Sequence, residues 1–126
     1  MEQKNLGKSK EDYLEAILIL NRRKGWCREI DIAGQLSFSR PSVSIALSKL
    51  ENEGYITREA SGEIRLTDAG RMVAENTLEK HEFFKNIFIR LGVEETTAET
   101  EACLVEHAIS EDTFQKLRDY VNRLDA

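Results

Sequence analysis

Three residues near the C-terminal end, Cys103, Glu106 and His107, combine the side chains and the spacing of a metal-binding helix. An α-helix has about 3.6 residues per turn, so positions i, i+3 and i+4 share one face. The chain contains only 2 cysteines and 2 histidines, and one of each lies in this segment. A thiolate, a carboxylate and an imidazole are ligands of divalent transition metals. The spacing therefore predicts that this segment contributes to a metal site.

Further candidate ligands lie elsewhere in the chain. His81 is the other histidine, and Asp12 and Glu15 stand three residues apart, which places both carboxylates on one face of a helix. The combined set of nitrogen, sulfur and carboxylate donors would fill an octahedral or slightly smaller coordination sphere. Each donor also has an ordinary structural interpretation, because solvated histidines, buried free cysteines and acidic residues near a helix start are all common. Spacing alone leaves both interpretations open.

The periodicity of apolar residues predicts a mainly α-helical fold with one β-hairpin. We expect helices over 9–25, 28–37, 40–53, 68–92, 95–109 and 111–124 and a hairpin over 55–67. The expected N-caps are Ser9, Ser39, Thr67 and Ser110, and Pro41 fits the first turn of the third helix. Three helices followed by a hairpin form a winged helix-turn-helix, predicted at 1–68, with an all-helical metal-binding and dimerisation domain at 69–126.

The third predicted helix is the candidate DNA reader, because the second helix of a helix-turn-helix pair enters the major groove. Its outward positions carry hydroxyls and cations, with no acidic residue before Glu51. Such side chains suit phosphates and base edges, and arginines of the hairpin would contact the DNA backbone. The predicted DNA-binding residues are Ser37, Ser39, Arg40, Pro41, Ser42, Ser44, Lys49, Arg58 and Arg65. The alternative is a compact domain whose serines serve only as helix caps.

The net charge of −5 is unevenly distributed along the chain. Residues 1–66 carry 11 basic and 10 acidic side chains, hence +1, and residues 67–126 carry 7 and 13, hence −6. A DNA-reading half joined to an acidic, cation-binding half would produce this asymmetry, as would ordinary surface charge.

No apolar run approaches the roughly 18 residues of a membrane span, and we see no secretion signal. Without a CxxC motif, we expect a reduced, cytoplasmic protein.

Several motifs resemble the diphtheria toxin repressor family of iron- and manganese-dependent transcriptional regulators. They are EDYLEAI at 11–17, SRPSVSIALSKLENEGYI at 39–56, LTDAGR at 66–71, KHEFF at 80–84 and EACLVEHAIS at 101–110. The resemblance implies a homodimer that binds one or two Fe(II) or Mn(II) ions per chain between the winged helix and the dimerisation helices. It further implies that the metal-bound dimer binds a palindromic DNA operator and represses metal-uptake genes. The SH3-like domain of longer members has no counterpart in this sequence.

The ligands implied by the resemblance form a hybrid of two family branches. Those that match the manganese-responsive branch are Asp12, Glu15, His81, Glu106 and His107. Cys103 stands where that branch has a carboxylate and the iron-responsive branch has cysteine, and Asp12 stands where the iron-responsive branch has methionine. Thiolates favour softer ions and carboxylates favour Mn(II), so the metal stays open. Lys85 and Glu99 replace a glutamate and a histidine of the iron-responsive branch's ancillary site. A complete ancillary site of that type is therefore not expected, although Glu99 could still support a second ion.

The later part of the long helix is the predicted dimer interface. The residues concerned are Phe83, Phe84, Ile87 and Phe88, for which the alternative is an internal core.

Two rival functions also stay open. One is a metal-independent winged-helix regulator that senses an organic ligand or oxidation of Cys103. The other is a small metalloenzyme with Glu106 as general base, which is disfavoured because the chain has no HExxH motif and no phosphate-binding glycine loop. An enzyme is therefore not expected.

Overall fold

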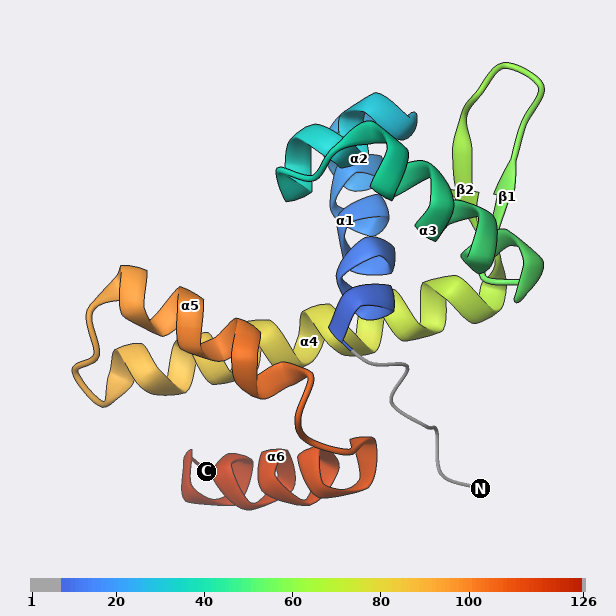
Figure 1. The fold of residues 1–126 in the computed structure, drawn as a ribbon. Helices are drawn as coiled ribbons and strands as arrows, with labels where there is room; N and C mark the ends of the chain where they lie inside the picture. Colours follow the sequence, from blue (N-terminus) through green and yellow to red (C-terminus); the bar gives the residue numbers. More distant parts are fainter. Residues whose placement is uncertain (1–7, 126) are drawn as a thin grey trace. The chain divides into compact units, whose positions relative to one another are not determined.

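The structure, a computed structural model, describes residues 8–125 as a mainly helical chain with a single β-hairpin in that range (Figure 1). The predicted fold class is confirmed, with a winged helix-turn-helix followed by helices. Two compact units are present, one spanning Lys8–Glu75 and the other beginning at Asn76. The long helix α4 (Asp68–Arg90) starts in the first unit and ends in the second. We call them the reader unit and the helical unit.

The reader unit has the element order that the sequence predicted. Its elements are α1 (Lys8–Lys24), α2 (Glu29–Leu36), α3 (Arg40–Asn52), β1 (Ile56–Arg58), β2 (Ile64–Leu66) and the start of α4. The strands pair antiparallel, with Ile56 opposite Leu66 and Arg58 opposite Ile64. The core of the unit includes Leu14, Ile17, Leu18, Ile32, Val43, Leu47, Leu50, Ile56 and Ile64, all at most 2% exposed. Burial of these apolar side chains is the main force that holds the helices and the wing together.

Three of the four expected helix caps are confirmed by hydrogen bonds. The side-chain oxygen of Ser39 accepts from the Ser42 amide at 3.4 Å, and that of Thr67 accepts from the Gly70 amide at 3.2 Å. Ser110 likewise caps α6 (Glu111–Asp125) through the amide of the third residue along. The expectation for Ser9 was wrong, because α1 already begins at Lys8 and Ser9 lies inside its first turn. The Asp12 side chain meets Lys8 at 2.7 Å, one helical turn away.

The turn between α2 and α3 is built around a left-handed residue. Ser37 has φ 58° and ψ 37° and is the only non-glycine residue with positive φ in the described range. This conformation ends α2 in a compact turn, in which the Phe38 amide donates to the Ala33 carbonyl at 3.1 Å. The chain then reverses directly into the Ser39 cap of α3. The close connection fixes the direction in which α3 leaves α2.

Gly70 lets the first turn of α4 pack closely on the wing. A Cβ atom at this position would collide with the backbone carbonyl of Tyr55, which directly precedes β1. The absence of a side chain therefore permits an approach that alanine would prevent. The two compact units consequently divide inside α4, after Glu75, rather than at its start.

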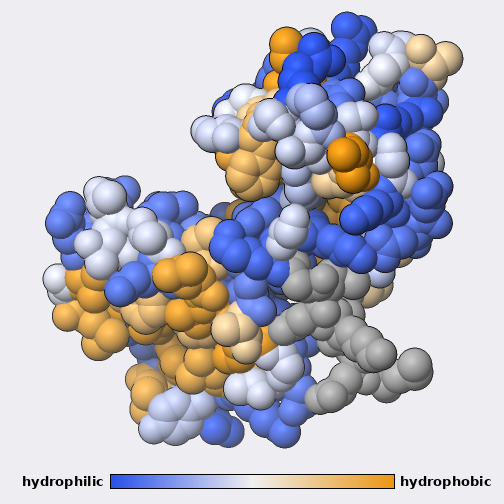
Figure 2. All heavy atoms as spheres, viewed as in Figure 1, coloured by the Kyte–Doolittle hydropathy of each residue, from blue (hydrophilic) through white to orange (hydrophobic). Residues whose placement is uncertain are grey.

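The helical unit packs α5 (Glu95–Glu106) and α6 against the later turns of α4. Its core consists of Phe84, Ala102 and Phe114, with Phe83 meeting both rings edge-on at centroid distances of 5.3 Å. Apolar side chains also gather on the surface of this unit, visible as orange atoms in Figure 2. The exposed large ones are Ile89, Leu91, Leu104, Tyr120 and Leu124. Among residues 8–125, no helix combines the length and the apolarity needed to span a bilayer.

Candidate metal centre and DNA-reading face

The end of α5 brings Cys103, Glu106 and His107 together. A Cys103 sulfur, a Glu106 carboxylate oxygen and a His107 ring nitrogen lie within 4.8 Å of one another. Helix α5 ends at Glu106, earlier than the predicted residue 109, and His107 forms its C-cap with φ −90° and ψ −10°. This backbone conformation is close to helical. The side chain of His107 therefore still lies on the same face as those of Cys103 and Glu106, although His107 is just outside the helix.

The Glu106 carboxylate lies at the centre of the site, facing an imidazole on either side. Glu106 is 1% exposed, and its two oxygens lie 2.7 Å from His81 Nδ1 and 3.1 Å from His107 Nε2. Neither oxygen accepts a hydrogen bond with good geometry, and His81 Nδ1 makes none either. A buried carboxylate without aligned hydrogen bonds is costly, and a cation between it and the imidazoles would satisfy it. The donor set therefore fits a divalent ion.

The same carboxylate controls the charge of His81. The short contact with Glu106 raises the pKa of His81 from 6.5 to about 9, an effect that burial opposes and that Glu99 reinforces. Near neutral pH, the imidazole is therefore protonated when no metal is present. A metal ligand must be the neutral form, so a cation at this site displaces a proton.

Glu99 and Lys85 form a pair of charged residues on the Nε2 side of the His81 ring. His81 Nε2 donates to a Glu99 oxygen at 2.7 Å, and the other Glu99 oxygen accepts from Lys85 Nζ at 2.9 Å. These contacts lower the pKa of the Glu99 carboxyl against the opposing effect of burial. Lys85 and Glu99 are the two positions at which the sequence departed from the ancillary site. In this chain they form an ion pair with each other.

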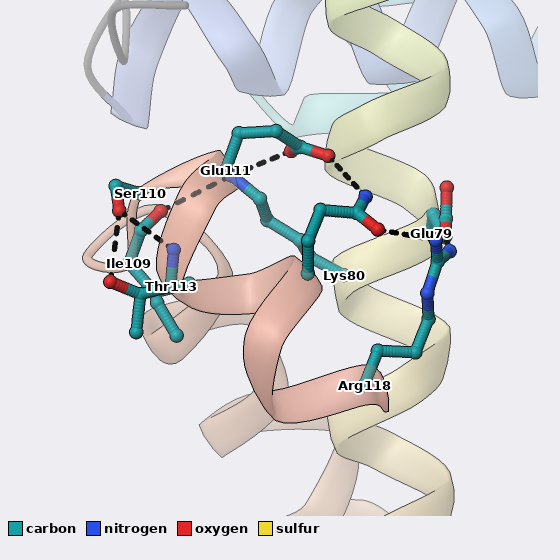
Figure 3. A network of polar contacts seen from close by, with 8 residues as sticks. Glu79, Lys80, Ile109, Ser110, Glu111, Thr113 and Arg118 are labelled. Atoms are coloured by element: carbon teal, nitrogen blue, oxygen red, sulfur yellow. Dashed lines mark hydrogen bonds and ion pairs between the residues drawn. The ribbon is translucent and has the colours of Figure 1, made fainter. Parts of the chain in front are cut away.

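A buried lysine secures the loop that follows His107. Lys80 precedes His81 on α4 and is 5% exposed, and its Nζ donates to the Ile109 carbonyl at 3.1 Å (Figure 3). The Glu111 carboxylate lies 3.6 Å away and offsets the buried charge. Figure 3 shows the network continuing along α6 to Arg118, which pairs with Glu79 of α4. Lys80 was not among the predicted site residues, because its partners lie about thirty residues further along the chain.

The carboxylates of Asp12 and Glu15 belong to the reader unit. Both lie on α1 one turn apart, and both are half-buried. Their position on α1 separates them in the chain, and by unit, from the four donors of the helical unit.

The predicted DNA-binding residues of α3 are nearly all exposed, as contact with DNA requires. Ser37, Ser39, Arg40, Pro41, Ser42 and Lys49 are exposed, and Ser44 is half-buried. Arg40 and Lys49 are both exposed cations on α3. The start of α3 thus presents hydroxyls and a cation on one surface.

The two arginines of the wing are already engaged within the reader unit. Arg58 donates to the Ser44 carbonyl at 3.2 Å and to the Ser48 hydroxyl at 3.0 Å, both on α3. Arg65 lies 3.0 Å from Glu63 and 3.7 Å from Glu59, so two carboxylates offset its charge. Arg58 therefore braces the wing against α3, a role that its position in the hairpin did not reveal.

The predicted interface residues divide between the core and the surface of the helical unit. Phe84 is 7% exposed and belongs to the core of its own chain, as the internal-core alternative had it. Phe83 and Phe88 are partly buried against that core, and Ile87 is half-buried. The most exposed apolar side chains are instead Leu91, Leu104 and Leu124, at 75, 59 and 67%.

Comparison with known protein families decides the affiliation. Residues 5–62 match the family model of the iron dependent repressor N-terminal DNA-binding domain, and residues 67–126 match that of its metal-binding and dimerisation domain. The chain belongs to the iron dependent repressor family. Members of this family are metal-responsive, DNA-binding transcriptional regulators, and the resemblance seen in the sequence motifs is thereby confirmed.

Individual relatives support the family assignment. The transcriptional regulator MntR of Escherichia coli O6:H1 is 32% identical over 113 residues, which is 90% of this chain and 73% of the relative. An uncharacterized HTH-type transcriptional regulator of Methanocaldococcus jannaschii is 32% identical over 94% of this chain and 96% of its own. The solved structure of the manganese regulator SloR superimposes with TM-score 0.79 and 28% identity over 90% of this chain. The chain spans about half of that structure's length, 53%.

Proposed function

We propose that this iron dependent repressor family member represses transcription when Fe(II) or Mn(II) binds at Glu106. The observation that carries the proposal is the buried Glu106 carboxylate, which faces two imidazoles without accepting an aligned hydrogen bond. The nearby Cys103 sulfur adds a further donor. The family description names iron and SloR is a manganese regulator, so the relatives support both ions. The relatives from Escherichia coli and Methanocaldococcus jannaschii support a regulator that acts in the cytoplasm, where the chromosome of such organisms lies.

The proposed ligand set combines residues of both units. His81, Cys103, Glu106 and His107 come from the helical unit, and Asp12 and Glu15 are proposed to join them from α1. Two imidazoles and three carboxylates are borderline to hard donors that suit Mn(II), and the thiolate shifts preference toward Fe(II). The set leaves one ion per chain as the simplest stoichiometry, because Glu99 is engaged by Lys85 and His81.

The mechanism follows from the division of the ligands between two units. An ion that takes donors from both would favour one arrangement of the reader unit relative to the helical unit. In a homodimer, that arrangement would set the separation of the two α3 helices, and half-sites of a palindrome recur at about 34 Å or multiples of it. Metal would then raise DNA affinity through its differential binding to this arrangement, and DNA would raise metal affinity by the same factor.

The homodimer is proposed to form through the apolar surface of the helical unit. Phe83, Ile87 and Phe88 retain partial exposure beside the core, and Leu104 and Leu91 are well exposed. Exposed apolar side chains that gather on one unit favour contact with a partner. The family description of residues 67–126 as a dimerisation domain supports this assignment.

The test compares DNA binding with and without metal. Chelator-treated protein should bind a palindromic operator, selected from random DNA in the presence of Mn(II), about 10- to 100-fold more weakly than protein with Mn(II) or Fe(II). Glu106→Gln keeps the shape of the buried side chain but removes its charge, and should abolish the metal response.

The matched control separates loss of metal from loss of DNA contact. Arg40→Ala should bind metal like the wild type and lose about 1–3 kcal/mol of DNA affinity. Equal operator binding by metal-free and metal-bound wild type would contradict the proposal. It would favour a metal-independent winged-helix regulator that responds to an organic ligand or to oxidation of Cys103.

A further inference from the structure

The two ring nitrogens of His81 face two different carboxylates. Nδ1 lies 2.7 Å from Glu106, and Nε2 lies 2.7 Å from Glu99. Glu106 is buried at the centre of the candidate metal centre, whereas the Glu99 side chain is 52% exposed and lies on the opposite edge of the ring. The side chain of His81 itself is only 13% exposed, so its orientation is held by these neighbours.

The two contacts differ in geometry. The contact between Nε2 and Glu99 is a hydrogen bond, whereas Nδ1 lies close to Glu106 without hydrogen-bond alignment. In a neutral imidazole, one nitrogen carries the proton and the other carries a lone pair. A proton retained at Nε2 by Glu99 leaves the Nδ1 lone pair directed to the Glu106 side of the ring, where the ion is proposed to bind.

Lys85 holds the Glu99 carboxylate in its position beside His81 Nε2. Its ammonium group lies 2.9 Å from the Glu99 oxygen that His81 does not use. Each carboxylate oxygen therefore accepts from one N–H donor, and the side chain is held between α5 and α4. A carboxylate engaged in this way acts as a hydrogen-bond acceptor and is not available to bind a further ion.

We propose that Glu99, held by Lys85, is a positioning residue that selects the metal-binding tautomer of His81 and is not itself a metal ligand. The inference rests on the proposed function, because it assigns a role around the same metal centre. Hydrogen bonds from metal-bound histidines to carboxylates fix the ring and increase its basicity, and their loss typically lowers metal affinity about 10- to 100-fold. Because Glu99 is half exposed, water can partly replace it, and the effect belongs at the lower end of this range.

The test uses Glu99→Ala and Glu99→Gln, with Glu101→Ala as the matched control. Glu101 is an exposed glutamate on the same helix, so its loss changes the net charge by the same amount. Co(II) affinity is measured by competition with a chelator, and the absorption spectrum reports the donors. Glu99→Ala should bind Co(II) about 10-fold more weakly with an unchanged spectrum, because the ligands stay the same. Glu99→Gln retains a neutral acceptor and should lose less, and Glu101→Ala should match the wild type.

A second measurement reads the tautomer directly. In Zn(II)-bound wild type, ¹⁵N NMR should show the His81 proton at Nε2 and protected from exchange with water, and Glu99→Ala should lose that protection. Wild type that binds no Co(II) would overturn the proposed function and this inference with it. Wild-type binding together with equal affinities of Glu99→Ala and Glu101→Ala would overturn this inference alone. A changed Co(II) spectrum in Glu99→Ala would also overturn it, because Glu99 would then be a ligand.

Discussion

Metal binding should release a countable number of protons, because the proposed ligand His81 is protonated in the metal-free protein. The contact with Glu106 raises the pKa of His81 to about 9. At about pH 7.5 the imidazole is therefore roughly 97% protonated, and displacing its proton weakens the apparent affinity about 30-fold relative to a neutral ring. A cysteine thiol that binds a metal as its thiolate releases a further proton.

The count can be assigned to single residues by substitution. We expect about two protons per ion for the wild type and about one for Cys103→Ala at the same pH. Cys27→Ala is the matched control, because Cys27 is the only other cysteine and is fully buried in the reader unit. It should release as many protons as the wild type.

The assay is calorimetric titration with Mn(II) in buffers of different ionisation enthalpy, which yields the number of protons transferred to the buffer. His81→Gln should lower the count by about one in either cysteine background. If the wild type released fewer than one proton per ion, the assignment of His81 as a ligand would be refuted. If Cys103→Ala still released two, the thiol would be excluded as the source of the second proton.

Two further predictions concern the stability of the metal-free protein. The folded-state pKa of His81 lies above its unfolded value near 6.5, so the stability that His81 contributes is complete below about pH 6.5 and is lost as pH rises through about 9. The Tm of thermal unfolding should therefore fall across this pH window. In His81→Gln the fall in Tm should be smaller. Gly70→Ala should lower the urea unfolding free energy by about 1–3 kcal/mol, because the new Cβ would collide with the Tyr55 carbonyl, and an unchanged stability would contradict the close approach. Gly34→Ala, a helical glycine with open space around it, is the control and should stabilise by about 0.5–1 kcal/mol.

Local features of the fold were predictable from the sequence because their causes are local. Ser39, Thr67 and Ser110 each accept a hydrogen bond from an amide three residues later, and such a cap needs no distant partner. The end of α5 was not predictable in this way. The chain leaves the helix after Glu106, and Lys80 on another helix holds the carbonyl of Ile109. Nothing in the α5 segment itself indicates that contact.

The candidate site was predictable only in part, for a related reason. Spacing identified Cys103, Glu106 and His107, because one helix end carries all three. The hydrogen bond from His81 to Glu99 joins α4 to α5, and periodicity within either helix says nothing about it. The apolar periodicity of a helix is likewise the same whether its apolar face packs against the chain's own core or against a partner chain. Phe84 was therefore expected at an interface but lies in the core.

The engagement of Arg58 with α3 bears on how this protein discriminates between DNA sequences. The wing is joined to α3 through hydrogen bonds to Ser44 and Ser48 that involve no ligand of the proposed metal site. The surface proposed to meet the bases is therefore held by contacts within the reader unit, and little conformational entropy would be lost there on binding. A signal that acts only on the spacing between two such surfaces changes how tightly the dimer binds every site. It leaves the ranking of one half-site sequence over another unchanged.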